Sequence, residues 1–291
     1  MREELRRRLV ETRARAPEQI AAAAASRPRR PALIGETGRL MIIAADHTAR
    51  GILGVGGHPM AMASRFDLLD RLMVALSRPG VDGVLGTADI IEDLMLLGAL
   101  DGKIAVGSMN RGGLLGSVFE MDDRFTGYTA AGIVAGKLDA GKMLLRIDPS
   151  DPATVRTLAA CADAVTELAA ARTPVMIEPF MITHASGGPR NDLTPDGAIR
   201  SVGISSGLGT TSAYTWLKLP VVAEMDRVAE ASTLPILLLG GDPSGDREAM
   251  FASWKRALRL PTVRGLVVGR SLLYPSAGDV AAAVDTAVGL L

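Results

Sequence analysis

Eight short apolar runs alternate with longer helical patterns along most of this sequence. They lie at residues 40–46, 81–86, 103–108, 142–147, 174–178, 214–219, 235–240 and 263–268. Most of the runs are continuously apolar, which is typical of strands buried on both faces of a parallel sheet. Apolar residues at helical spacing lie between the runs, as at residues 66–78. Eight strand–helix units over about 250 residues predict an α/β fold, a (β/α)8 barrel.

A doubly wound parallel sheet is the alternative, because it has the same alternation of strands and helices. Gly54, Gly56 and Gly57 follow the first run too late to form a dinucleotide-binding loop, and no correctly spaced third glycine or acidic partner follows. We therefore expect one barrel domain over residues 31–291. Residues 1–30 are expected to be a helical extension, with a helix over residues 1–25 that ends before a proline-rich stretch.

Composition argues against several classes of protein. The 32 basic and 32 acidic residues cancel, which argues against a nucleic acid or a membrane surface as the main partner. A single cysteine, no secretory signal and no membrane-length apolar run predict a cytoplasmic protein. Few of the basic residues are lysines, so a lysine in an apolar run calls for an explanation. The lysines are Lys103, Lys137, Lys142, Lys218 and Lys255.

Two of the predicted strands carry a lone charged residue among apolar neighbours. Lys218 lies between Leu217 and Leu219. Burial lowers the pKa of a lysine, and the neutral amine is the nucleophile that a Schiff base requires. A lysine paired with a carboxylate inside the barrel is the alternative. Glu178, at the end of the fifth run, is a candidate general acid or base, or else a partner for Lys218 or Arg146.

Asp46 and Arg146 lie at the carboxyl ends of the first and fourth runs, where barrels carry their active sites. Asp46 could move protons or hold a substrate hydroxyl, or it could cap the following loop. Arg146 could bind an anion or position Asp46, or it could form a salt bridge inside the barrel. Both are taken as candidate catalytic residues together with Lys218 and Glu178.

The ends of the last two strands predict a phosphate site. Gly240, Gly241 and Gly269 leave backbone N–H groups open before predicted helices, and Arg270 adds a positive charge. Glycines that serve only the turns are the alternative. His47 is a further candidate for substrate binding. The histidines have no pair at metal-ligand spacing, so no metal site is predicted. The loop at residues 184–192 could close over a substrate, or it could be a plain surface loop.

Five short motifs occur in the order found in a known group of enzymes. They are AADH (44–47), MIEPF (176–180), WLKLP (216–220), LLLGG (237–241) and VVGR (267–270). On these motifs the chain resembles class I aldolases of the DeoC, archaeal-type fructose-bisphosphate and LacD group over roughly residues 30–291. More narrowly, it resembles actinobacterial aldolase-like barrels associated with inositol catabolism.

The resemblance implies a lyase that cleaves a phosphorylated keto sugar or keto acid through a Schiff base on Lys218, without metal or organic cofactor. One such reaction converts 5-dehydro-2-deoxy-phosphogluconate into dihydroxyacetone phosphate and malonate semialdehyde. The expected partners are a phosphorylated small molecule and further copies of the chain in a homo-oligomer. Two rivals stay open: a metal-dependent barrel lyase with His47 and His184 as ligands, and a non-catalytic sugar-phosphate-binding barrel.

The sequence departs from the group in two places. Arg146 stands on the fourth strand where some relatives have a lysine, which shifts its expected role towards anion binding. The loop at residues 240–246 contains Asp242 and Asp246, whose negative charges would repel a phosphate dianion unless they point away from it.

Overall fold

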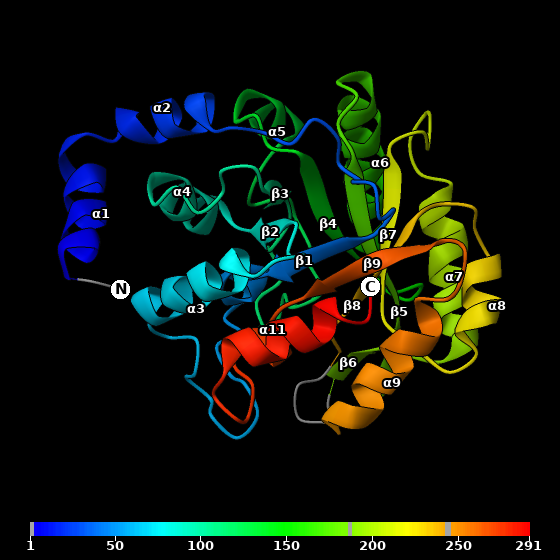
Figure 1. Cartoon of the computed structure of the whole chain (residues 1–291). Coiled ribbons are helices and arrows are strands. Elements are labelled where there is room, and N and C mark those ends of the chain that lie inside the picture. The colour runs from blue at the N-terminus through cyan, green and yellow to red at the C-terminus, as the bar shows by residue number, and fades with distance from the viewer. Residues whose placement is uncertain (1–2, 186–187, 242–245) are drawn as a thin grey trace.

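Eight parallel strands close into a barrel in the computed structural model of the chain (Figure 1). The structure describes residues 3–185, 188–241 and 246–291. The barrel strands are β1 (Leu40–Ala44), β2 (Gly83–Gly86), β3 (Ile104–Ser108), β4 (Ala140–Ile147), β5 (Val175–Ala185), β7 (Thr215–Leu219), β8 (Ile236–Leu239) and β9 (Val263–Val268). They pair in this order, β9 pairs with β1, and the β4–β5 pair makes the ring continuous. The predicted (β/α)8 barrel is confirmed, and the open doubly wound sheet is wrong.

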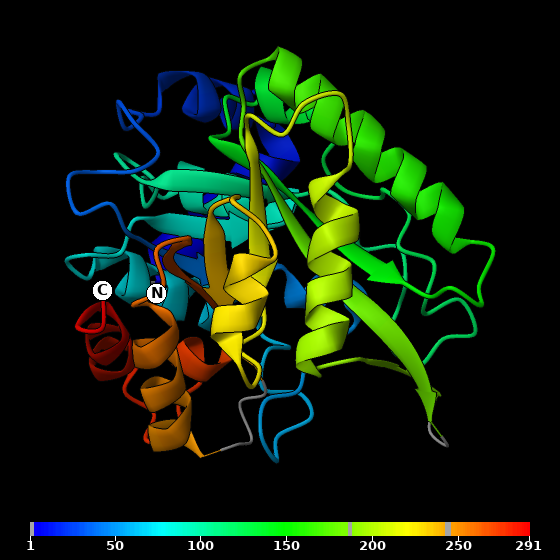
Figure 2. The same cartoon turned by 90° about the vertical axis from the view of Figure 1, so that its right-hand side faces the viewer.

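Helices cover the outside of the barrel, as α6 (green) and α7 (yellow-green) do in Figure 2. The helices are α1 (Glu3–Arg15), α2 (Glu18–Ser26), η1 (Asp46–Arg50), α3 (Arg65–Ser77), α4 (Ala88–Leu96), α5 (Ala130–Ala135), α6 (Thr154–Ala170), α7 (Pro195–Ser206), α8 (Met225–Glu230), α9 (Arg247–Ala257), α10 (Arg270–Leu273) and α11 (Val280–Val288). In α3 the buried residues include Leu68, Leu69, Leu72 and Leu76, which recur at helical spacing on one face. That face packs on the strands and stabilises the barrel.

The inside of the barrel changes character along the strands. An apolar cluster fills it towards the amino ends, and its members include Leu40, Ile42, Ile104, Val106, Met176 and Leu237. Further along the strands the buried side chains include Asp46, Lys142, Glu178 and Lys218. Burying a charge costs several kcal/mol unless a partner compensates it. The charged side chains therefore make the carboxyl-terminal end of the barrel the candidate place for a functional site.

The amino-terminal extension consists of two helices and not of the single helix expected over residues 1–25. Pro17 lies between α1 and α2, and a proline has no N–H to continue the helical hydrogen bonds. The extension lies against the barrel's helices: α2 packs on α4, and Arg13 of α1 pairs with Asp93 of α4 at 2.8 Å. Arg27 donates to the carbonyl of Lys103 at 2.7 Å. The extra helical segment is thus confirmed, while a domain boundary at residue 30 stays a prediction.

The fifth strand does not end at Glu178 but runs on to Ala185. Its outer part pairs with β4 as far as Met181 and then, antiparallel, with β6 (Gly188–Asn191). The segment 184–192, expected to be a loop, is therefore largely a hairpin arm, and residues 186–187 lie outside the described residues. Pro189, Arg190 and Asn191 of this arm line the cavity of the barrel, so its position still suits contact with a ligand.

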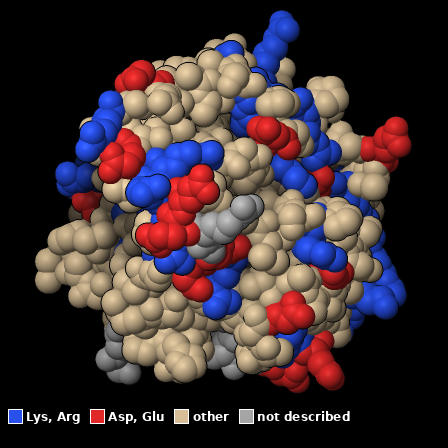
Figure 3. Space-filling model, turned by 60° about the vertical axis from the view of Figure 1, so that its left-hand side comes forward, with Lys and Arg blue, Asp and Glu red and all other residues tan. Residues whose placement is uncertain are grey.

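Basic and acidic side chains are interspersed over the face shown in Figure 3. Neither sign forms a large continuous field there, in keeping with a formal net charge of zero. Among the described residues, no helix has both the length and the apolar character needed to cross a bilayer.

Gly265 in β9 tests the packing of the barrel. Its φ is +139°, and an added Cβ would lie 1.9 Å from the carbonyl oxygen of Leu40. We expect Gly265→Ala to lower the free energy of unfolding by about 2–4 kcal/mol, because both the backbone and the neighbouring strand must shift. Gly203 in α7 is the matched control, since nothing lies within 4 Å of an added Cβ there. Gly203→Ala should raise stability by about 0.5–1 kcal/mol. Urea unfolding measures both, and wild-type stability in Gly265→Ala would contradict the packing.

Candidate active site

Lys218 and Glu178 form a buried ion pair inside the barrel. The register that pairs Ile177 with Leu217 brings the next residues of β5 and β7, Glu178 and Lys218, side by side. The Lys218 Nζ lies 2.5 Å from Glu178 Oε1. The two residues are only 4% and 8% exposed. Both line the large cavity at the carboxyl ends of the strands, so a ligand can reach this pair.

A second lysine, Lys142 of β4, lies behind Glu178. Its Nζ contacts Glu178 Oε2 and lies 3.5 Å from Asp46 Oδ2. Lys142 is fully buried and does not line the cavity. Glu178 therefore bridges two ammonium groups, one facing the cavity and one facing the interior.

Asp46 begins η1, directly after the first strand, and is fully buried. Its Oδ2 accepts a hydrogen bond from Ser108 Oγ at 3.0 Å and contacts Arg111. Its Oδ1 has no hydrogen-bond partner among the described residues. Asp46 thus compensates part of the positive charge of Arg111 and Lys142 from below the cavity.

These contacts set the pKa values of the cluster. Burial alone would raise the pKa of Glu178, but the charges of Lys142 and Lys218 outweigh it and hold that pKa far below its usual range. Arg111 and Lys142 have the same effect on the pKa of Asp46. Burial, helped by the charge of Arg111, lowers the pKa of Lys142 to about 8. Both carboxyls are therefore ionised at neutral pH, whereas Lys142 can give up its proton a little above it.

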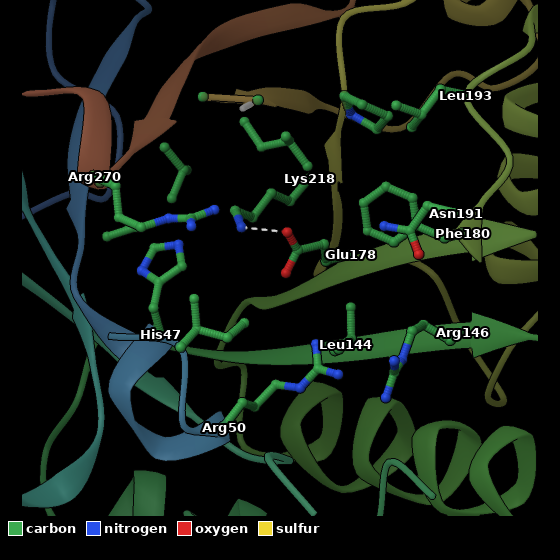
Figure 4. Close-up of a pocket in the computed structure, with 18 of the residues that line it drawn as sticks. His47, Arg50, Leu144, Arg146, Glu178, Phe180, Asn191, Leu193, Lys218 and Arg270 are labelled. Carbon is green, nitrogen blue, oxygen red and sulfur yellow. Dashed lines mark hydrogen bonds and ion pairs between the residues drawn. The ribbon is translucent and has the colours of Figure 1, made fainter. Parts of the chain in front are cut away.

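The cavity has a volume of about 790 Å³. Figure 4 shows the Lys218–Glu178 pair in the middle of the view, Arg270 and His47 towards one side, and Arg50 and Arg146 below and to the other. The ionisable side chains that line the cavity are Arg50, Arg111, Arg146, Arg190, Lys218, Arg270, His47, Glu120 and Glu178. Cations outnumber carboxylates, so the cavity favours an anionic ligand.

The predicted phosphate-binding residues all border this cavity. Gly240 and Gly241 follow β8, and Gly269 and Arg270 follow β9. An added Cβ on Gly269 would meet the Ala44 carbonyl oxygen at 2.2 Å, so close packing against the first strand also requires a glycine there. The helix expected after β9 is only the four-residue α10. Asp246 caps α9 by accepting from two of its backbone N–H groups, while Asp242 lies outside the described residues.

His47 lies on the same side of the cavity as Arg270 and is neutral. Burial lowers its pKa to about 3, although the charge of Asp46 acts in the opposite direction. Its Nδ1 has no hydrogen-bond partner among the described residues. His47 is therefore suited to a hydrogen bond with a ligand and not to charge neutralisation.

Arg146 lines the cavity. It does not contact Asp46, which it was predicted to position as one of its possible roles. Its guanidinium binds Asp123 through two hydrogen bonds, of 2.8 Å from Nε and 2.6 Å from Nη2. Arg50, at the end of η1, reaches the same region and donates from Nε to the Gly113 carbonyl at 2.8 Å. The partner that positions Asp46 is Arg111, from the segment after β3.

The arrangement of the histidines does not match the metal-site alternative. His184 lies on the outer part of β5, where its Nε2 is 2.6 Å from Asp148 Oδ2. His47 lies on the opposite side of the barrel ring, beside β1. No group of three or more His, Cys, Asp or Glu side chains suited to a metal ion occurs within residues 3–185, 188–241 and 246–291.

Sequence reasoning thus identified Lys218, Glu178, Asp46, Arg146 and the glycine ends, and the structure brings all of them to one end of the barrel. It missed Lys142, Arg111 and Arg50. For Lys142 a signal existed: it is one of few lysines and opens an apolar run. It lies four residues before Arg146, hence on the same face of β4. The roles of these residues stay predictions.

Comparisons with known proteins agree with this architecture. A family model described as Cgl0159-like matches residues 38–288. The crystal structure of Cgl0159 from Corynebacterium glutamicum (Brevibacterium flavum) is 56% identical, covers 100% of this chain and 97% of its own, and superimposes with a TM-score of 0.96. The search of curated proteins found no match.

More distant structures share the fold. A Schiff-base-forming fructose-1,6-bisphosphate aldolase is 17% identical over 93% of this chain and 99% of its own, with a TM-score of 0.67. An archaeal fructose 1,6-bisphosphate aldolase is 16% identical over 93% of this chain and 98% of its own, with a TM-score of 0.66. At such identities the likeness establishes the barrel and leaves the reaction to be argued from the site.

Proposed function

The chain belongs to the Cgl0159-like family, and we propose that it is a class I aldolase that cleaves a phosphorylated keto sugar or keto acid through a Schiff base on Lys218. One observation carries the proposal: Lys218, which is only 4% exposed, still lines the cavity and touches a carboxylate through its amine. Such an amine can be held in place and deprotonated next to a bound ketone. We place the Schiff base on Lys218 and not on Lys142, because Lys142 lies behind Glu178 and does not line the cavity.

The reaction proceeds from the neutral amine of Lys218, which attacks the ketone carbon of the substrate. Loss of water from the adduct, with a proton returned to the leaving hydroxyl from Lys142 through Glu178, gives an iminium, which draws electrons from the neighbouring C–C bond. A base removes the proton of the hydroxyl group whose C–C bond breaks, an aldehyde leaves, and the resulting enamine is protonated and hydrolysed. Glu178 is the group placed to receive this proton, because it lines the cavity whereas Asp46 lies below it. Since its own pKa is held low, it passes the proton on to Lys142, which it touches.

The second lysine explains how Lys218 loses its proton. Glu178 itself is a weak acceptor because its pKa is held low by two ammonium groups. Lys142, whose pKa is about 8, can be neutral near physiological pH. Since Glu178 touches both lysines, it can pass a proton from Lys218 to Lys142 while remaining ionised at the start and the end. We therefore assign Lys142 to proton transfer.

Substrate identity is proposed on the charge of the cavity. Arginines line it on several sides, so an anionic substrate is favoured. Fructose 1,6-bisphosphate is the substrate named for the distant structural neighbours, and 5-dehydro-2-deoxy-phosphogluconate is the candidate that the sequence resemblance suggested. Both carry a ketone, which the proposed Schiff base needs, and negative charge, which the arginines of the cavity favour.

Trapping with borohydride tests the proposal. The protein is incubated with dihydroxyacetone phosphate, fructose 1,6-bisphosphate or 5-dehydro-2-deoxy-phosphogluconate, reduced, digested and analysed by mass spectrometry. We expect a reduced adduct on the peptide that contains Lys218, with at least one of these ketones. A substrate that is turned over without any adduct on Lys218 would refute the Schiff base. Activity that is lost on exhaustive chelation and restored by a divalent metal would favour the metal-dependent lyase instead.

A further inference from the structure

The carboxyl end of the barrel holds a second group of cations, on the side opposite the glycine ends. In the closed ring of eight strands, β4 lies four positions from β9, and β3 lies four positions from β8. The glycine ends follow β8 and β9. Arg146 lies on β4, and the segment between β3 and α5 supplies Gly113 and Glu120. Arg50 reaches this segment from η1, so the two arginines meet across the cavity from Gly240 and Gly269.

In each guanidinium at least one nitrogen is held by a hydrogen bond within the protein, and another can still donate to a ligand. Nε and Nη2 of Arg146 are bound to Asp123, and Nε of Arg50 is bound to the Gly113 carbonyl. Arg146 Nη1 and Arg50 Nη2 face Glu120 Oε1 at 3.8 and 4.0 Å, too far for hydrogen bonds. Among the described residues these nitrogens have no hydrogen-bond acceptor. The fixed contacts hold the two groups in place, and Arg146 Nη1 and Arg50 Nη2 lie near the same Glu120 oxygen, hence near each other.

The two arginines also repel each other. Arg50 is only 8% exposed, and burial together with the charge of Arg146 lowers its pKa to about 10. A negatively charged group between them would relieve both effects. Glu120 supplies only part of this compensation, because its Oε2 accepts from the backbone N–H of Gly116 at 2.8 Å and keeps the carboxylate turned to its own loop.

From this geometry we propose that Arg50 and Arg146 form a second anion subsite, which binds a carboxylate of the substrate at the end remote from the glycine side. The proposal rests on the proposed function for the assignment of the cavity to a ketone substrate. Arg146 lies beside Phe180, two residues along β5 from Glu178, which is about 7 Å along the strand. A short carbon chain bound at Lys218 can therefore reach the subsite with its terminal group.

A carboxylate fits better than a phosphate because acidic side chains already lie at the subsite. The carboxylates of Asp123 and Glu120 lie beside the two guanidinium groups, so a monoanion meets less repulsion there than a dianion. The substrate class assigned in this way is a keto acid with a phosphate at its far end. Glu120 lies near both arginines, so the carboxylate of the ligand must bind beside Glu120 or displace it.

Binding of three probes without a carbonyl group tests the subsite independently of Schiff-base chemistry. The probes are 6-phosphogluconate, glucitol 6-phosphate, which lacks the carboxylate, and glucitol 1,6-bisphosphate, which replaces it with a phosphate. By calorimetry on the full chain we expect 6-phosphogluconate to bind at least about tenfold more tightly than either of the others, the effect of charge-assisted hydrogen bonds. Equal affinity for 6-phosphogluconate and glucitol 6-phosphate would overturn the subsite. Tighter binding of the bisphosphate would overturn the carboxylate assignment.

Variants show which residues cause the preference for 6-phosphogluconate. Arg50→Gln should remove the preference for 6-phosphogluconate, and Glu120→Gln should tighten its binding about threefold or more, because a like charge is lost. Arg146 is left unchanged, since its loss would strand the buried Asp123. Arg78→Gln, which removes an exposed arginine that pairs with Asp285 on the outside of the barrel, is the control for charge. A preference that survives in Arg50→Gln contradicts the proposal, whereas a failed borohydride trap with the preference intact refutes only the Schiff base.

Discussion

Lys218→Met is expected to abolish borohydride trapping and to lower turnover by about 10⁴-fold or more, because the covalent intermediate can no longer form. Methionine has a similar length and no charge, so it fills the space that the Lys218 side chain occupies inside the barrel. Glu178 keeps Lys142 as its partner and is not left as an unpaired buried charge. The variant should therefore fold, which circular dichroism and urea unfolding can check.

A residual adduct would show which lysine reacts. Lys142→Met is the matched variant, since it removes the other lysine bound to Glu178 and leaves Lys218 facing the cavity. Mass spectrometry should find the adduct on the Lys218 peptide in wild type and in Lys142→Met, and on no peptide in Lys218→Met. Turnover near the wild-type rate in Lys218→Met would end the Schiff-base assignment, and an adduct on Lys142 would move it to β4.

The fold and the central ion pair could be predicted because both follow from local patterns. Continuous apolar runs indicated the strands, and a lone charge inside such a run stood out, as Lys218 and Glu178 do. Once the strands pair in parallel, the register brings those two residues together. No long-range information was needed for this part of the site.

Lys142 could not be recognised in the same way, because it occupies the first position of its apolar run. A lysine at such a position is ordinarily a solvated strand end, whereas here β4 begins two residues earlier, at Ala140, and turns Lys142 inward. The predicted end of the fifth strand at Glu178 was wrong for a related reason. The strand continues because β6 pairs with it, and pairing partners are not visible in the residues of one strand.

Arg50 and Arg111 lie outside the strands, in segments without periodicity. Arg111 matters because Asp46, distant in sequence, is its partner, and Arg50 matters because Gly113 and Glu120 come close to it. Such contacts depend on how loops of the closed barrel meet. The charge of these residues was evident from the sequence, but their place in the cavity required the structure.

Lys142→Met is expected to remove a pH dependence as well as activity. In the wild-type protein kcat/KM should rise with pH and level off above about 8. The reason is that the pKa of Lys142 is lowered to about 8 and only its neutral form accepts the proton from Lys218 through Glu178. Deprotonation of Lys142 creates the proton acceptor, so kcat/KM falls as the pH falls and Lys142 becomes protonated. Without Lys142, kcat/KM at pH 8 should drop by about 10²-fold or more, and the rise near pH 8 should disappear.

A purely structural role for Lys142 would give a different result. Asp46 keeps Arg111 and Glu178 keeps Lys218 in the variant, so neither carboxylate is left unpaired and the fold should survive. Loss of activity with the rise near pH 8 intact would mean that Lys142 only holds Glu178 in place. Lys255→Met, which removes an exposed lysine of α9, should leave both the rate and the pH profile as in the wild type. The dependence of kcat/KM on pH thus distinguishes the two roles of Lys142. If Lys142 transfers the proton, kcat/KM follows its protonation, whereas a lysine that only positions Glu178 would not cause the rise near pH 8.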